Sequence, residues 1–308
     1  MPTAATFRHA LHAMLIAPLL LLPVSASAFD EASPSMDEIG IPSGGVRLNG
    51  LIYLAAGKSA HPVVVFLHGY PGNERNLDTA QDVRRAGYNA VYFDYRGSWG
   101  TGGKFSFQHG LEDVDAVMAW LQAPANVAKY HIDPKRITLV GHSFGGWLAL
   151  MSAAHLPDTV CISSMAGWNL GWAAKRFDEH PKERAESLAY FVETTDGESG
   201  PIDAHADDLI AEMEAHAEPW DYLKQAAALK SHALLLIGAT DDSPDEDALM
   251  SNAMASAVKK AGGHRVRALT FQDDHPFSAN RDPLSAALLH WLRTDCAAQQ
   301  MPRPASKR

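Results

Sequence analysis

The chain has 308 residues, of which 46% are hydrophobic and 20% charged, and its formal net charge is −10. This composition supports a large hydrophobic core and excludes global disorder, and the acidic balance argues against nucleic acid as a partner. The chain has two cysteines, Cys161 and Cys296, and no Cys-x-x-Cys spacing for a metal. The sequence leaves their pairing open. Cys161 lies in an apolar run, where a buried free thiol is the more common state.

Residues 1–28 have the features of a signal peptide. Arg8 is their only charged residue, residues 11–22 form a short apolar stretch, and Ala-Ser-Ala at 26–28 is a small-residue cleavage pattern. We expect cleavage after Ala28 and a secreted or periplasmic location, with an uncleaved membrane anchor as the alternative. No later stretch is long and apolar enough to span a bilayer, so we expect no stable membrane insertion after cleavage.

Strands and helices alternate after a loose lead-in, rich in Ser, Pro and Gly, over residues 29–45. Strand patterns cover residues 46–54, 62–67, 88–94, 136–140, 159–165, 233–237 and 265–271. Helical patterns cover residues 76–86, 111–121, 144–155, 246–261 and 283–292. This alternation predicts one α/β domain over residues 29–308, with a mostly parallel central sheet flanked by helices.

The alternation breaks over about residues 168–230, which contain helical stretches and no clear strand. Because this block lies between two predicted strands, we interpret it as an inserted helical cap. Fourteen acidic residues lie between Asp178 and Asp221. We interpret them as a solvated surface, with binding of a cationic substrate group as the alternative.

Two further features of the predicted cap bear on ligand binding. Four residues of the cap are of types that bind metals, namely His205, Asp208, Glu212 and His216. Their spacing matches no defined ligand set, so we predict no metal site. Three tryptophans either line an apolar acyl pocket or pack within the cap: Trp168, Trp172 and Trp220.

A candidate nucleophile follows the strand predicted at residues 136–140. There the chain reads Gly-His-Ser-Phe-Gly over residues 141–145 and continues directly into a helix. A sharp turn from strand to helix needs small residues on both sides and exposes the central hydroxyl at the end of the sheet. We therefore predict Ser143 as the nucleophile, the alternative being an inert serine at a glycine-rich helix start. We interpret the adjacent His142 as a packing residue.

A serine nucleophile needs a base, normally a histidine, that is oriented by a carboxylate. His275 is the histidine in the loop after the last predicted strand, and we predict it as the base. The loop after residues 233–237 offers two aspartates. We favour Asp241, because Gly-x-x-Asp after a strand is the usual spacing of the acid, and keep Asp242 as the alternative. Both could instead cap the next helix.

Acyl transfer also needs hydrogen-bond donors for the negative charge that develops on the carbonyl oxygen. One predicted donor is the backbone N–H of Phe144. The loop after the strand at residues 62–67 reads His-Gly-Tyr-Pro-Gly, and its Pro71 has no N–H, so Tyr70 is the predicted second donor. The alternative is an ordinary Gly/Pro turn.

These segments occur in the order found in the α/β-hydrolase superfamily, which the chain resembles over nearly all of residues 46–292. Residues 94–100 (Asp-Tyr-Arg-Gly-Ser-Trp-Gly), with Phe105 beyond them, are similar to the catalytic domains of prolyl oligopeptidase and acylaminoacyl peptidase. The chain has no room for the β-propeller of those peptidases, and its cap resembles that of stand-alone esterases and aminopeptidase-like hydrolases. We expect Arg96 to fix the turn in which it lies.

The resemblance implies serine hydrolysis of an ester or amide without a cofactor. We therefore predict a secreted serine hydrolase that cleaves a carboxylic ester, or a related acyl bond, of a small molecule through an acyl-enzyme on Ser143. The alternatives are a serine peptidase or aminopeptidase acting on short peptides, and a non-enzymatic binding protein on the same scaffold. The sequence leaves the substrate's identity and the oligomeric state open.

Overall fold

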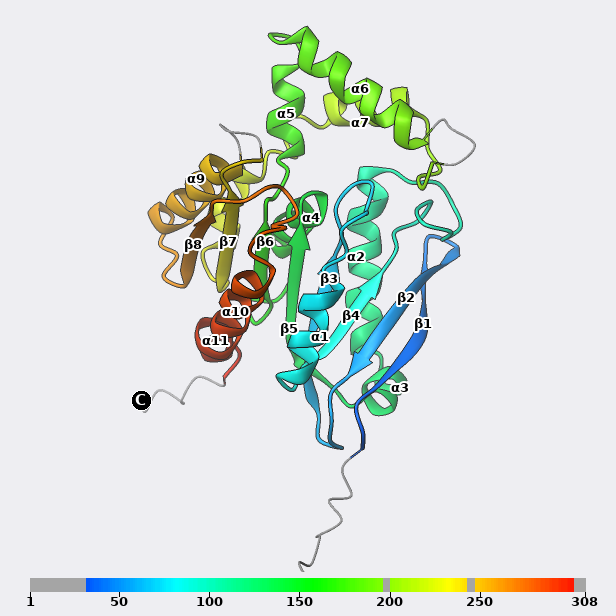
Figure 1. Ribbon diagram of the computed structural model, residues 1–308, viewed down its shortest axis with the longest axis vertical. Helices are drawn as coiled ribbons and strands as arrows, with labels where there is room; N and C mark the ends of the chain where they lie inside the picture. Colours follow the sequence, from blue (N-terminus) through cyan, green and yellow to red (C-terminus); the bar gives the residue numbers. More distant parts are fainter. Residues whose placement is uncertain (1–31, 196–199, 243–246, 302–308) are drawn as a thin grey trace, which may run out of the picture. The chain divides into compact units, whose positions relative to one another are not determined.

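The computed structural model describes residues 32–195, 200–242 and 247–301, so the predicted signal peptide lies outside the described residues. Eight strands form one sheet in the order β1-β2-β4-β3-β5-β6-β7-β8 (Figure 1). The pairs β1/β2 and β2/β4 are antiparallel, and all the others are parallel. The predicted α/β fold with a mostly parallel sheet is confirmed.

The elements follow the predicted alternation in chain order. The strands are β1 Ser35–Ser43, β2 Val46–Leu54, β3 His61–Leu67, β4 Asn89–Phe93, β5 Ile132–His142, β6 Cys161–Met165, β7 Leu234–Ala239 and β8 Val266–Phe271. The helices are α1 Leu77–Arg85, α2 Phe107–Gln122, α3 Pro124–Lys129, α4 Phe144–Ala153, α5 Leu170–Arg176, α6 Pro181–Thr195, α7 Ala206–Ala215, α8 Ala226–Leu229, α9 Asp247–Lys260, α10 Arg281–Trp291 and α11 Ala297–Gln300. A 3₁₀ turn, η1 Tyr222–Gln225, precedes α8, and a π-helical turn, η2 Leu292–Cys296, follows α10.

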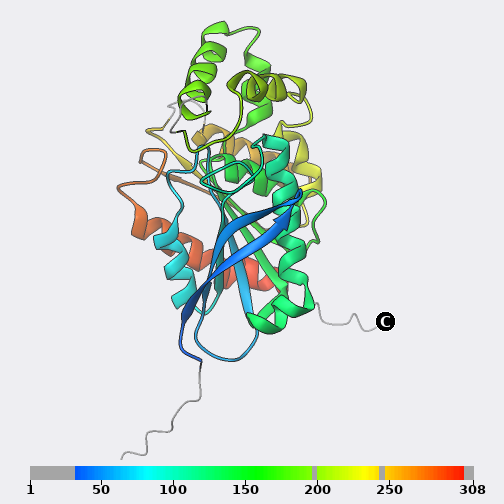
Figure 2. The same ribbon diagram turned by 90° about the vertical axis from the view of Figure 1, so that its right-hand side faces the viewer.

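Helices cover both faces of the sheet, which buries apolar side chains on each side (Figure 2). One core cluster joins the sheet to α2, α4 and α9, and the other joins it to α1 and α10. The central strand β3 shows why the pattern at residues 62–67 is apolar throughout. Val63 and Val64 are adjacent residues of β3, and their side chains face opposite core clusters; both are fully buried.

The predicted loose lead-in at residues 29–45 was wrong in part, because it contains the edge strand β1. Ile39 and Ile41 of this strand are buried, so one of its faces belongs to the core. The chain then reverses at Gly44 and Gly45, whose φ values are +54° and +81°. Consecutive positive φ values suit a tight hairpin, and they place β1 beside β2 in antiparallel register.

The helices of the predicted cap, α5 to α8, lie between β6 and β7 in the chain. Figure 1 shows α5, α6 and α7 beyond the carboxyl ends of the parallel strands. Ligands of open α/β sheets bind at that end, so these helices lie where they can cover a site. In the part of the chain that the structure describes, no helix is long and apolar enough to cross a membrane.

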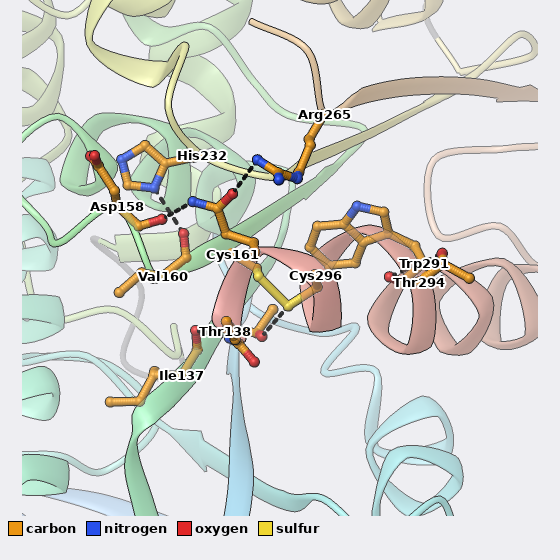
Figure 3. Close-up of a disulfide and its surroundings, with 12 residues drawn as sticks. Ile137, Thr138, Asp158, Val160, Cys161, His232, Arg265, Trp291, Thr294 and Cys296 are labelled. Atoms are coloured by element: carbon orange, nitrogen blue, oxygen red, sulfur yellow. Dashed lines mark hydrogen bonds between the residues drawn. A yellow bond between two sulfur atoms is a disulfide. The ribbon is translucent and has the colours of Figure 1, made fainter. Parts of the chain in front are cut away.

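Cys161 and Cys296 form a disulfide, which corrects the expectation of a buried free thiol (Figure 3). Their Cα atoms lie 5.7 Å apart, within the normal bridging range. Cys161 begins β6, whereas Cys296 ends the turn after α10. The bridge spans 135 positions along the chain, and so its partners could not be placed together from local sequence patterns.

Candidate active site

The strand β5 passes into α4 through Ser143, whose φ of 56° and ψ of −120° are unfavourable for a residue with a side chain. Glycines make this turn sterically feasible. A Cβ on Gly141 would lie 1.9 Å from the carbonyl oxygen of Gly145, and one on Gly145 would lie 2.0 Å from that of Leu67. These contacts explain the Gly-x-Ser-x-Gly pattern and give Ser143 the geometry of a nucleophile elbow.

Backbone hydrogen bonds fix the elbow on both sides of the Ser143 side chain. The N–H of Ser143 donates to the carbonyl of Met165 in β6 at 2.9 Å. The carbonyl of Ser143 accepts from Gly146 at 2.9 Å and from Trp168 at 3.1 Å. Ser143 is therefore held at the carboxyl end of the sheet and at the positive N-terminus of α4, where developing negative charge is stabilised.

The loop after β8 brings His275 to the same site, and its partner there is Asp242. The Nδ1 atom of His275 makes a short hydrogen bond with Oδ2 of Asp242. Since a carboxylate only accepts, Nδ1 carries the proton and Nε2 of the neutral ring is left able to accept one. This is the arrangement required of a general base and its orienting acid.

The prediction of Asp241 as the partner of His275 was wrong on this geometry. The N–H of Asp241 donates to the carbonyl of Asp273 at 2.9 Å, which joins the loop after β7 to the loop after β8. The exposed Asp241 carboxylate accepts from Thr240 Oγ1 at 2.9 Å. The next residue, Asp242, lies in the bend that follows β7 and is the carboxylate that bonds His275.

His142 contacts the His275 loop and contributes more than the predicted packing. Its Nε2 lies 2.9 Å from the backbone carbonyl of His275, and the two rings are 4.6 Å apart between centroids. Complete burial lowers the pKa of His142 to about 3. The ring is therefore neutral near pH 7, and its Nε2–H donates to the carbonyl and tethers the loop.

The loop after β3, which carries the predicted second oxyanion donor Tyr70, contacts Ser143. A Cβ on Gly69 would lie 3.0 Å from that of Ser143, so the loop backbone passes in close contact with the serine. Two aromatic side chains hold the loop. Tyr95 Oη donates to the carbonyl of His68 at 3.0 Å, and Trp99 Nε1 donates to the carbonyl of Pro71 at 2.6 Å. Tyr70 directly follows Gly69, and Phe144 directly follows Ser143, so each predicted donor is next in the chain to a residue of this contact.

Ser143 and His275 line one cavity of about 190 Å³. The loop at residues 69–74 forms another side of it, and Tyr190 of α6 contributes from the cap. Tyr190 was not predicted from the sequence. It is 47 positions from Ser143 in the chain, and no local pattern indicates that a helix of the cap brings it to the same cavity. Larger cavities of about 350 Å³ lie elsewhere, one of them beside Lys135 and Met301.

The three cap tryptophans pack rather than line this cavity. Trp220 is buried, and its ring lies 5.2 Å from that of Trp147. Trp168 contacts Phe107, with 5.9 Å between the ring centroids. Trp172 contacts the Arg176 guanidinium, which lies 4.6 Å from its ring. Packing is thus the interpretation that the structure supports, and the volume available to a substrate is set by other residues.

Several acidic residues of the cap have structural partners. Four of their ion pairs are Arg176–Glu183, Arg184–Glu214, Lys175–Glu218 and Lys104–Asp203. Glu212 accepts hydrogen bonds from the N–H groups of Phe107 and Gln108, and so caps α2. Among the described residues, none of the cap carboxylates lines the cavity beside Ser143. A solvated and locally paired surface therefore describes them best.

Two other sequence expectations concern residues away from the cavity. Arg96 is buried and fixes its turn as expected, through hydrogen bonds of 2.6 Å to Asp113 and to Glu112. Over residues 32–195, 200–242 and 247–301, no group of three or more His, Cys, Asp or Glu side chains is arranged to hold a metal ion. His216 instead stacks on Trp220 with 4.4 Å between ring centroids.

Residues 64–287 match the model of the alpha/beta hydrolase family, and the chain belongs to this family. It is 34% identical over 116 residues to the uncharacterized peptidase YuxL of Bacillus subtilis. The aligned segment covers 34% of this chain and 17% of that relative. It is 30% identical over 143 residues to the quorum-quenching protein AidA of Acinetobacter baumannii, covering 44% of this chain and 45% of that protein. The chain therefore spans less than half the length of these relatives.

A solved structure with a similar fold is the Pyrococcus furiosus esterase Pf2001. It superposes with a TM-score of 0.63 at 18% identity, over 84% of this chain and 91% of the esterase. At this level of identity the likeness establishes the fold alone. The roles of individual residues rest on the geometry described above.

Proposed function

We propose that the protein is a serine esterase that cleaves small carboxylic esters through an acyl-enzyme on Ser143. The observation that carries this proposal is the shared cavity of Ser143, in its strained elbow, and His275, which is paired with Asp242. Family membership and the esterase fold of Pf2001 support it.

The proposed reaction has two half-reactions. The Oγ of Ser143 attacks the ester carbonyl while Nε2 of His275 takes its proton, and Asp242 stabilises the resulting imidazolium. The N–H groups of Phe144 and Tyr70 donate to the oxyanion. His275 then protonates the departing alcohol, and the acyl group remains on Ser143. Water, deprotonated by His275, attacks this acyl-enzyme. The bond to Ser143 Oγ then breaks, His275 returns the proton to that oxygen, and the carboxylic acid is released.

The small cavity favours short acyl chains. Pockets for drug-sized ligands occupy roughly 300–1,000 Å³, whereas the cavity beside Ser143 has about 190 Å³. The first test therefore compares 4-nitrophenyl acetate, butyrate and octanoate. We expect kcat/KM to fall at least about tenfold from butyrate to octanoate, and Ser143→Ala to lose about 10³-fold or more with every ester. If Ser143→Ala hydrolysed the esters at the wild-type rate, the proposal would be overturned. Ester hydrolysis would then not depend on Ser143, and a non-enzymatic role of the cavity beside Ser143 would be favoured.

Peptidase activity is a second candidate, favoured by the 34% identity to the peptidase-named YuxL. It uses the same residues and differs in the bond that is cleaved. Alanine 4-nitroanilide, measured beside the esters, separates the two functions. Turnover of the anilide at a kcat/KM above that of the acetate ester would assign peptidase activity, and its absence across a panel of aminoacyl anilides would reject that activity.

We also propose that the protein is exported to an oxidising compartment. Two independent features support this location: the signal-peptide pattern of residues 1–28 and the disulfide between Cys161 and Cys296.

A further inference from the structure

The cap helix α6 contacts the loop that carries the proposed oxyanion donor Tyr70. Tyr190 Oη donates to the backbone carbonyl of Tyr70 at 3.2 Å. In the opposite direction, Tyr70 Oη lies 2.6 Å from Oγ1 of Thr194, one turn further along α6. Two separate polar contacts therefore join one residue of the loop to one helix of the cap.

Thr194 closes these contacts into a ring of hydrogen bonds. Its Oγ1 lies 3.0 Å from the carbonyl oxygen of Tyr190, to which it can donate while accepting from Tyr70. The chain of contacts thus runs from Tyr70 Oη through Thr194 to the backbone of Tyr190, and returns from Tyr190 Oη to the backbone of Tyr70. The contact between Tyr70 and Thr194 is buried, and the bond from Thr194 to the Tyr190 carbonyl continues it, so the two reinforce each other.

Aromatic packing holds the same pair of segments together. The ring of Tyr70 lies 5.3 Å from that of Phe191 and 5.9 Å from that of Tyr190, both edge-to-face. Tyr70 is 8% exposed, whereas Tyr190 is 44% exposed and lines the cavity beside Ser143. The Tyr190 hydroxyl is thus bonded to the Tyr70 carbonyl, while part of the Tyr190 side chain remains exposed to solvent.

We propose that Tyr190 is a positioning residue that orients the main chain of Tyr70, and thereby its oxyanion-binding N–H, through the hydrogen bond to the Tyr70 carbonyl. The inference rests on the proposed esterase function and assigns part of its oxyanion site to the cap. The carbonyl and N–H of Tyr70 flank one Cα atom. Restraining the carbonyl and the side chain together limits the backbone rotations that would turn the N–H away.

The position of α6 therefore affects the chemical step as well as substrate access. A donor held in place before the reaction stabilises the transition state without reorganisation, whereas a rotating donor does not. Because the oxyanion develops fully only in the transition state, loss of this restraint lowers kcat more than it raises KM.

The test is Tyr190→Phe, which removes the hydroxyl and keeps the ring that borders the cavity. Direct removal of an oxyanion donor costs about 10²–10³-fold in kcat, so loss of its support should cost about tenfold, with KM changed less than about twofold. Tyr130→Phe is the matched control, since the hydroxyl of Tyr130 contacts Lys129 beside the amino end of β5, the end opposite Ser143. Tyr130→Phe should retain wild-type kcat.

A second readout separates positioning from a merely structural role. A trifluoromethyl ketone that adds to Ser143 places an oxyanion in the hole, so Tyr190→Phe should raise its inhibition constant by the same factor as it lowers kcat/KM. Thr194→Val breaks the other contact of the ring. The double variant should lose less than the product of the two single losses, because both changes disable one network.

Distinct outcomes decide the inference and the proposed function. Wild-type kcat in Tyr190→Phe, or a lowered kcat with unchanged ketone affinity, would overturn the positioning role while esterase activity stands. A wild-type protein that neither hydrolyses the esters nor binds the ketone would instead overturn the proposed function, and the inference with it. A comparable kcat loss in Tyr130→Phe would show that the effect is not specific to the cap contact.

Discussion

Asp242 and Asp241 are adjacent in sequence and differ in what their carboxylates contact. Asp242 accepts from Nδ1 of His275, whereas Asp241 accepts from the hydroxyl of Thr240 in its own loop. A carboxylate at Nδ1 fixes the ring's tautomer and stabilises the imidazolium formed during attack. The two aspartates therefore form a natural pair of test and control variants.

We expect Asp242→Asn to lower kcat by about 10³–10⁴-fold, because an amide at Nδ1 no longer stabilises the imidazolium and permits the wrong tautomer. Asp241→Asn should stay within about threefold of wild type. Steady-state kinetics on 4-nitrophenyl butyrate measure both, with circular dichroism to check folding. A large loss in Asp241→Asn with little loss in Asp242→Asn would reverse the assignment made from the structure.

The positions of Ser143 and His275 could be predicted from sequence, because each follows a strand whose apolar pattern is local. The choice between the two aspartates could not, since it depends on the backbone hydrogen bond from Asp241 to Asp273 in a different loop. Tyr190 could not be predicted either. Its contact with Tyr70 joins positions 120 residues apart and depends on how the cap helix meets the loop.

At the scale of elements, the buried parallel strands were predicted well because both of their faces are covered and most of their residues are apolar. The edge strand β1 was missed because one face is exposed and its sequence, Ser-Met-Asp-Glu-Ile-Gly-Ile-Pro-Ser, includes residues common in loops. Helix α2 begins at Phe107, before the predicted residue 111. Ser106 caps it by accepting from the N–H of His109 at 3.0 Å.

The elbow joins β5 and α4 into the element pair on which the site depends. Helix α4 is buried along nearly its whole length, so it can neither tilt nor shift without disturbing the core. This rigidity explains how the strained backbone of Ser143 is maintained. The cap helices make a different contribution, since they bring side chains such as Tyr190 to the cavity from outside the sheet.

At the scale of the whole molecule, the disulfide joins β6 to the C-terminal helical segment across 135 positions. We expect the double variant Cys161→Ala/Cys296→Ala to lose about 2–4 kcal/mol of unfolding free energy, since the unfolded chain gains freedom without the bridge. Urea unfolding of oxidised wild type and variant measures the difference. Because the bridge lies at the amino end of β6, away from Ser143, kcat at 25 °C should stay within about twofold.

Thiol titration provides the control for the disulfide. The unfolded wild-type protein, kept without reductant, should show no reactive thiols, and reduction should release two per chain. Two free thiols before reduction, or equal stability of the oxidised wild type and the double variant, would contradict the stabilising bridge.

The central claim is that Ser143 is the nucleophile, activated by His275 and Asp242, and covalent labelling tests it most directly. The wild-type protein is treated with a fluorophosphonate, and the adduct is mapped by peptide mass spectrometry. We predict one adduct per chain, located on Ser143, with none in Ser143→Ala and labelling slowed at least about 10²-fold in His275→Gln. An adduct on another residue, or equal labelling of Ser143→Ala, would contradict the account.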